Sequence, residues 1–232
     1  MWPVDGTIDT SLRQRLHAYA EKAIRESALH TSWNEPDADF EAAVHTWLDA
    51  VLDGPIGTEM TSLVVRLDLH ARSDSLGQKL IALTAPGVPD VYQGTELWED
   101  SLVDPDNRRP VDYAARAQAL KSLRHPKMRV VAAALRLRRD RATSFTDGGY
   151  TPVSADGPAA GHLVAFLRGD DVLTAVSRHT VMLSETGWGD TALALPPGQW
   201  TDRISGGQFN DQILAAELFA DLPVALLERS GG

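Results

Sequence analysis

The side chains best suited to chemistry lie in one segment, LTAPGVPDVYQGTELWEDSLVDPDNRRPVDY, at positions 83–113. Hydroxyl-rich ligands such as sugars need paired hydrogen-bond donors and acceptors beside an aromatic face. Carboxylates, amides and a guanidinium near Tyr92 and Trp98 supply both, so the segment predicts a sugar-binding surface. Its candidate residues are Asp90, Tyr92, Gln93, Glu96, Asp104, Asp106, Asn107 and Arg108.

The same segment also allows a purely structural interpretation. The sequence Asp104-Pro105-Asp106-Asn107 is typical of an Asx turn, whose carboxylates would pair with Arg108 and Arg109. Tyr92 would then be a core residue. Spacing alone does not decide between the two interpretations.

A short apolar run precedes these polar residues. Proline and glycine bracket Val88–Tyr92, which predicts a short buried strand. Helices are expected around it, at 11–29 with a Ser11–Gln14 capping box, between Pro36 and Gly54, and at 58–70, 75–84, 112–123 and 126–141. One parallel-type strand cannot satisfy its own ladder hydrogen bonds, so residues 1–141 are expected to be part of something larger. If Val88–Tyr92 is a strand of an α/β barrel, the polar residues that follow it lie on the working face, which the loops after the strands form.

The pattern changes to short β-rich runs from Tyr150 onward. Strands are predicted at 163–167, 172–176, 191–195 and 224–227, separated by Gly, Pro, Asp and Ser. The predicted fold class is therefore α/β plus all-β, with a helical domain at 1–141 and an antiparallel β-sandwich domain at 142–232.

Composition excludes several classes of protein. The chain has 232 residues, 43% of them hydrophobic, and a formal charge of −10, which disfavours nucleic acid and other polyanions as partners. The basic run at Arg136–Arg141 is expected to be a solvated helix face. Cysteine is absent, which excludes disulfides, thiolate zinc sites and a cysteine nucleophile, and favours a cytoplasmic location. Neither a membrane-spanning run nor a signal-peptide pattern is present, and no metal or cofactor is expected.

Several long strings resemble one known family. PGVPDVYQGTELW followed by SLVDPDNRRPVDY is similar to the stretch around barrel strand eight of the maltooligosyltrehalose synthases, in the α-amylase family. The opening WPVDG and residues 18–44, AYAEKAIRESALHTSWNEPDADFEAAV, resemble the same family. So do GGYTPV, HLVAFLRG, GWGDTALALP and PVALLER, in that order. The resemblance spans nearly the whole chain and concerns the carboxyl-terminal third of these enzymes.

This resemblance implies the last part of a (β/α)8 TIM barrel, with about one barrel strand, followed by a β-sandwich. It implies an isomerase of trehalose biosynthesis that converts the reducing-end α-1,4 linkage of a maltooligosaccharide into an α,α-1,1 linkage. The family's catalytic carboxylates precede the matched segment, so no catalytic residue is assigned and the isolated chain is expected to be inactive. The implied partners are a maltooligosaccharide and the upstream part of the barrel, from the same gene or a separate chain.

Two other classes of function remain open. A noncatalytic carbohydrate-binding module would present Trp188 and Trp200 as stacking platforms, although both indoles are equally compatible with a core. An assembly module would use apolar, barrel-facing helix surfaces to form a homo-oligomer.

Overall fold

The computed structural model describes residues 2–230 and divides into two compact units. The helical unit comprises Met1–Asp68 with Asp100–Pro110, and the sheet unit comprises Leu69–Glu99 with Val111–Gly232. Each unit is described by itself.

The helical unit contains α1 (Thr10–Ser27), α2 (Ala38–Asp53), the first part of α3 (Pro55–Thr84) and the short 3-10 helix η1 (Asp106–Arg108). The cap of α1 is Asp9, whose carboxylate accepts a hydrogen bond from the backbone of Leu12 at 2.7 Å, so the predicted Ser11–Gln14 box is wrong. The prediction that Asp37 opens the second helix is confirmed, since it accepts from the backbone of Phe40.

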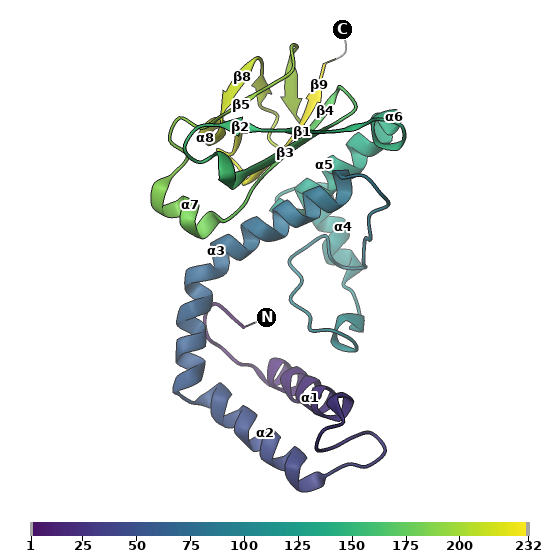
Figure 1. Cartoon of the computed structure of the whole chain (residues 1–232). Coiled ribbons are helices and arrows are strands. Elements are labelled where there is room, and N and C mark those ends of the chain that lie inside the picture. The colour runs from purple at the N-terminus through teal and green to yellow at the C-terminus, as the bar shows by residue number, and fades with distance from the viewer. Residues whose placement is uncertain (1, 231–232) are drawn as a thin grey trace. The chain divides into compact units, whose positions relative to one another are not determined.

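Helices α1 and α2 pack against each other through a polar cluster (Figure 1). The Nδ1 atoms of His17 and His45 lie 2.7 Å apart, and His17 Nε2 lies 3.0 Å from the Asp49 carboxylate. Arg13 on α1 pairs with both Asp49 and Asp53 on α2. Ion pairs and imidazole hydrogen bonds therefore join these two helices.

The sheet unit contains the rest of α3 and five further helices: α4 (Tyr113–Ser122), α5 (Pro126–Asp140), α6 (Ala142–Thr146), α7 (Thr180–Thr186) and α8 (Ala215–Leu218). The predicted helices at 58–70 and 75–84 are one continuous helix, α3, because no proline interrupts residues 71–74. Gly77 lets this helix approach the side chain of Val176 closely.

Two antiparallel sheets complete this unit. The larger has the order β1-β3-β4-β9-β6-β7, formed by β1 (Tyr150–Val153), β3 (Leu163–Arg168), β4 (Val172–Ser177), β9 (Val224–Arg229), β6 (Trp200–Asp202) and β7 (Gln208–Phe209). The smaller has the order β2-β5-β8, formed by β2 (Ala155–Asp156), β5 (Ala192–Ala194) and β8 (Gln212–Leu214). A short 3-10 helix, η2 (Ala160–His162), precedes β3. The four predicted strands are confirmed to within two residues at each end.

The central strands are buried on both faces. On β4, Val172 and Val176 lie in one core with residues of α3 and α5, whereas Leu173 and Ala175 lie in a second core with residues of the smaller sheet. Because successive side chains of a strand point to opposite faces, helices cover one face of the larger sheet and the smaller sheet covers the other. The helices α3 and α5 therefore share a core with the strands, although the sequence places them before the predicted boundary at residue 142.

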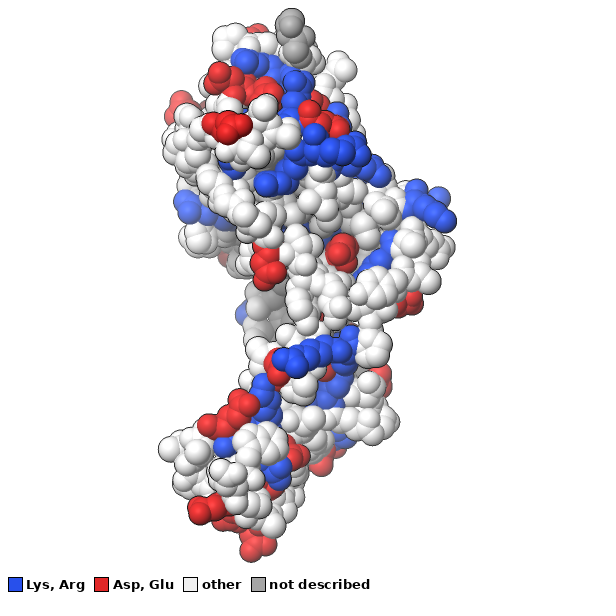
Figure 2. Space-filling model, turned by 90° about the vertical axis from the view of Figure 1, so that its right-hand side faces the viewer, with Lys and Arg blue, Asp and Glu red and all other residues white. Residues whose placement is uncertain are grey.

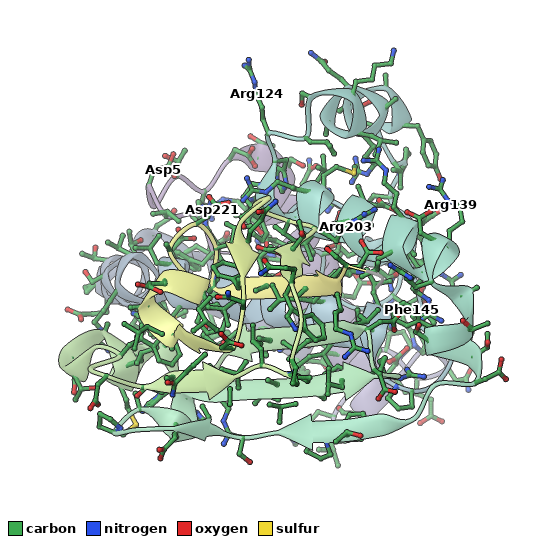
Figure 3. All side chains as sticks on the ribbon, turned by 90° about the horizontal axis from the view of Figure 1, so that it is seen from above. Asp5, Arg124, Arg139, Phe145, Arg203 and Asp221 are labelled. Carbon is green, nitrogen blue, oxygen red and sulfur yellow. The ribbon has the colours of Figure 1, made fainter. Side chains whose placement is uncertain are left out.

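Ion pairs of two arginines join the end of α5 to the strands. Arg203, labelled in Figure 3, pairs with Asp140 at the end of α5 and with Glu228 on β9. Arg141 pairs with the same glutamate. In Figure 2, blue and red side chains are interspersed on the face that is drawn. Much of the Arg136–Arg141 run is thus engaged in ion pairs.

The predicted strand at Val88–Tyr92 is absent from this chain. No sheet ladder among the described residues includes the segment, and Val88 is 97% exposed. A strand needs a neighbouring strand for its backbone hydrogen bonds, and this part of the chain has none beside it. The prediction of a strand here was wrong. No helix among residues 2–230 is both long and apolar enough to cross a membrane.

Candidate functional site

The predicted site residues fall into the two units. Asp104, Asp106, Asn107 and Arg108 lie on a loop of the helical unit, whereas Asp90, Tyr92, Gln93 and Glu96 belong to the sheet unit. The structure therefore defines two separate groups of candidate residues.

Asp106 is the most enclosed of the candidates, with a side chain only 10% exposed. Arg15 on α1 forms a bidentate ion pair with it, in which Nε donates to Oδ1 at 2.7 Å and Nη2 donates to Oδ2 at 2.8 Å. The backbone N–H of Leu102 also donates to Oδ2, at 2.7 Å. These donors, Arg15 foremost, lower the pKa of Asp106 below its usual value. The carboxylate is therefore a charged structural centre of the loop.

Further hydrogen bonds hold the 101–109 loop. The ammonium of Lys22 on α1 donates to the backbone carbonyl of Asp104. Within the loop, Arg109 Nη2 donates to the Ser101 hydroxyl at 3.1 Å. One face of α1 thus contacts the loop at two points.

Asp104 and Arg108 stand on the outer side of this loop. They form an ion pair, with side chains 46% and 70% exposed. Asn107 lies between Asp106 and Arg108, and its Oδ1 is buried without a hydrogen-bond partner among the described residues. The Asp104 carboxylate is half-exposed, with Oδ1 buried, and beside the exposed guanidinium of Arg108 it offers the acceptor and donors that sugar hydroxyls require. The structural interpretation, in which Arg108 and Arg109 pair with the carboxylates of the turn, is confirmed, because Arg108 pairs with Asp104 and Arg109 lies 3.1 Å from Asp106.

A cavity of about 340 Å³ lies between α1 and this loop. Tyr19 of α1 and Val103 of the loop are both exposed at its edge. The other lining residues are Ser11, Gln14, Arg15, Ala18, Pro105, Asp106 and Arg109.

The candidates in the sheet unit are more open. Tyr92 is 43% exposed, so the interpretation of it as a core residue is wrong, and Asp90 is exposed. The side-chain Oε1 of Gln93 accepts a hydrogen bond from the Tyr113 hydroxyl at 3.4 Å. Glu96 lies 3.8 Å from Arg116, which also donates to the backbone carbonyl of Gly94 at 2.7 Å. Arg116 therefore holds the end of this segment, while Asp90 and Tyr92 remain exposed.

The sequence HTSW at residues 30–33, between α1 and α2, is chiefly structural. Its buried Thr31 donates to Glu41 at 2.6 Å and accepts from the backbone of Asp37, so it fixes the start of α2. Arg25 binds the same glutamate with two nitrogens, and together these donors lower the pKa of Glu41 to about 2. Trp33 is exposed and lies 4.9 Å from the Arg25 guanidinium.

The two tryptophans of the predicted binding module have other surroundings. Trp200 is 0% exposed, and its ring N–H donates to the Pro196 carbonyl, so the interpretation of it as a core residue is confirmed and the alternative of a stacking platform is wrong. Trp188 is partly buried and stacks on Phe219 with a centroid distance of 5.3 Å. Within residues 2–230, no group of three or more His, Asp or Glu side chains could hold a metal ion.

Known proteins match this chain over nearly its whole length. No family model matches the chain. A maltooligosyl trehalose synthase of Mycobacterium tuberculosis (strain H37Rv) is 63% identical over 229 residues, which cover 99% of this chain and 30% of that protein. This chain is similar to the carboxyl-terminal part of maltooligosyltrehalose synthases.

Solved structures of maltooligosyltrehalose synthases agree with this match. The enzyme of Arthrobacter ramosus superposes with a TM-score of 0.87 at 40% identity, covering 98% of this chain and 31% of that one. A Sulfolobus tokodaii maltooligosyl trehalose synthase gives a TM-score of 0.70 at 26% identity, covering 95% and 30% of the two chains. The chain thus spans less than a third of the length of the relatives that it matches.

Proposed function

We propose that this chain forms the carboxyl-terminal portion of a maltooligosyltrehalose synthase of the cytoplasm. Such an enzyme converts the reducing-end α-1,4 linkage of a maltooligosaccharide into an α,α-1,1 linkage, in the biosynthesis of trehalose. The main support is the 63% identity to a maltooligosyl trehalose synthase over 99% of the chain. In this proposal residues 1–141 are part of the barrel domain and residues 142–232 form the β-sandwich domain.

The exposed ends of the two candidate segments bind the glucan. Asp104 and Arg108 bind sugar hydroxyls as a paired acceptor and donor, and Asn107 contributes its side-chain amide beside them, although its Oδ1 is buried. Asp106 instead shapes the loop, because its carboxylate is already bound by Arg15 and Leu102. In the sheet unit, Tyr92 supplies the aromatic face and Asp90, Gln93 and Glu96 supply polar groups.

The reacting carboxylates come from the portion that precedes this chain in the relatives. Retention of configuration requires a nucleophile and an acid/base about 5 to 5.5 Å apart. The nucleophile displaces the terminal glucose and forms a glycosyl-enzyme, while the acid protonates the leaving oxygen. The anomeric hydroxyl of that glucose then attacks the glycosyl-enzyme and returns its proton to the acid/base. Holding the glucose in place and excluding water favour this transfer over hydrolysis.

An exposed apolar stripe on α3 supports the proposal that this helix contacts another portion of the enzyme. Ile56, Met60, Leu63 and Leu67 recur at spacings of four, three and four and are all exposed. A stripe of this kind normally packs against another element. We assign it to contact with the upstream barrel portion, since this chain covers 30% of the length of its relative.

Maltopentaose turnover tests the proposal. The purified chain alone should give no trehalose-terminated product, whereas the chain joined to the upstream 70% of the Mycobacterium tuberculosis relative should give it. The upstream portion alone is the control. Product from the chain alone would refute the fragment proposal, and no product from the joined enzyme would refute the assigned activity.

A further inference from the structure

We propose that Arg15 on α1 is a positioning residue for the sugar-binding loop, holding Asp106 so that Asp104 and Arg108 face outward. This inference rests on the proposed function for its effect on catalysis, but its structural part can be tested independently. Arg15 and Asp106 lie 91 positions apart in the sequence and are joined by a bidentate ion pair.

The loop has little regular structure of its own. Apart from the three residues of η1, its internal order comes from single turns, such as Asp106 N–H to the Val103 carbonyl at 3.1 Å and Arg108 N–H to the Pro105 carbonyl at 3.0 Å. Turns of this kind fix local geometry without fixing where the loop lies on the molecule. Arg15 supplies most of that longer-range constraint, through Asp106 and through the Asp100 carbonyl at 3.4 Å, and Lys22 adds a contact to the Asp104 carbonyl.

Asp106 is well placed to transmit this constraint. It stands two positions from Asp104 and two from Arg108, and its side chain is 10% exposed, compared with 46% and 70% for theirs. A carboxylate that is 10% exposed must be paired, because an unpaired buried charge is strongly unfavourable. Without Arg15, Asp106 keeps Arg109 and the Leu102 N–H as donors. We expect the loop to open further so that water replaces the lost bidentate contact, and this movement displaces the ion pair on its outer side.

Arginine is specifically suited to this position. Its planar guanidinium presents two parallel N–H groups to the two carboxylate oxygens, whereas a lysine ammonium presents a single point charge. We therefore expect Arg15→Lys to keep the charge attraction but to lose much of the orientation. Arg13 provides a matched control, because it lies on the same helix and pairs with two carboxylates, Asp49 and Asp53, without contacting the loop.

Hydrogen exchange and trypsin cleavage of the whole chain test the structural part. Arg15→Met should raise amide exchange in residues 101–109 and cleavage after Arg108 about tenfold, as expected for loss of one strong charge-assisted bond. Arg13→Met should leave both unchanged, and Arg15→Lys should give an intermediate value. Equal effects of Arg15→Met and Arg13→Met on the loop would overturn the proposal. If Arg15→Met also raises amide exchange in α1 and α2, exchange of residues 101–109 is compared between Arg15→Lys and Arg13→Lys instead. Faster loop exchange in Arg15→Lys supports the proposal, and equal loop exchange in the two variants overturns it.

Kinetics of the joined enzyme test the catalytic part. With maltopentaose, Arg15→Met should raise KM about tenfold and increase the ratio of free glucose to trehalose-terminated product, while Arg13→Met retains the parent's values. A uniform loss of kcat with unchanged KM and unchanged product ratio would count against positioning. An inactive unsubstituted joined enzyme would refute the proposed function instead, leaving the exchange measurement to judge Arg15.

Discussion

Two segments rich in the same polar residue types differ in how they are held. The loop at 101–109 is fixed by a nearly buried carboxylate bound to α1, whereas the segment at 86–96 leaves Val88, Val91 and Tyr92 exposed and pairs with no strand among the described residues. The first segment is stabilised by contacts within this chain. The second has the apolar content of a buried strand without the neighbours that would bury it. Similar composition therefore does not imply similar order.

The largest expected effect concerns the open segment. When the chain is joined to the upstream portion of its relative, hydrogen exchange at residues 86–92 should slow by at least about a hundredfold, because backbone groups buried in a sheet exchange only through substantial opening. Exchange at 101–109 should change much less, since Arg15 already holds that loop. Equal slowing in both segments, or none at 86–92, would contradict the distinction.

A second experiment compares one carboxylate from each segment. Asp106→Ala leaves the guanidinium of Arg15 without its main partner and should lower the free energy of unfolding by about 2 kcal/mol in urea denaturation. Asp90→Ala removes an exposed carboxylate and should change it by less than about 0.5 kcal/mol. Asp106→Asn keeps the shape of the side chain and an acceptor for the Leu102 N–H, so its change in the free energy of unfolding should lie between those of the two alanine variants.

The apolar stripe on α3 allows a smaller effect to be measured. Leu63→Lys places a charge on a surface that is exposed in this chain, so the stability of the chain alone should change by less than about 0.5 kcal/mol. Association with a separately produced upstream portion should weaken clearly, as measured by light scattering. If the chain forms a homo-oligomer by itself and Leu63→Lys abolishes it, the stripe is a self-association surface instead. An equivalent substitution outside the stripe, Thr46→Lys on α2, serves as the control.

The smallest expected effect is the response to acid. The pKa of Glu41 is lowered to about 2, chiefly by Arg25 and then by Thr31, and that of Asp106 is lowered chiefly by Arg15. The folded state therefore binds these protons less readily than the unfolded state. For Glu41 the stabilisation is complete above pH 4.5, the ordinary value, and declines as the pH falls toward about 2. Glu41→Gln should flatten the decline of Tm over this range, and an unchanged decline would contradict the assignment to Glu41.

Much of the fold was predictable from local patterns. The carboxylates at Asp37, Asp39 and Glu41 indicated the start of α2, and short β-rich runs between turn residues indicated β3, β4 and β9. The patterns failed where long-range pairing decides the outcome. Val88–Tyr92 has the composition of a strand, but a strand exists only beside a partner, and periodicity does not report whether one is present.

The sequence by itself determined the local elements, the absence of cysteine chemistry and the resemblance to one enzyme family, because helix caps, apolar periods and long motifs depend on neighbouring residues. Tertiary structure alone decided that Arg15 binds Asp106 across 91 positions, that Trp200 is a core residue and that α5 shares a core with the strands. Burial and ion pairing depend on distances in space, which residues far apart in the chain acquire only when it folds.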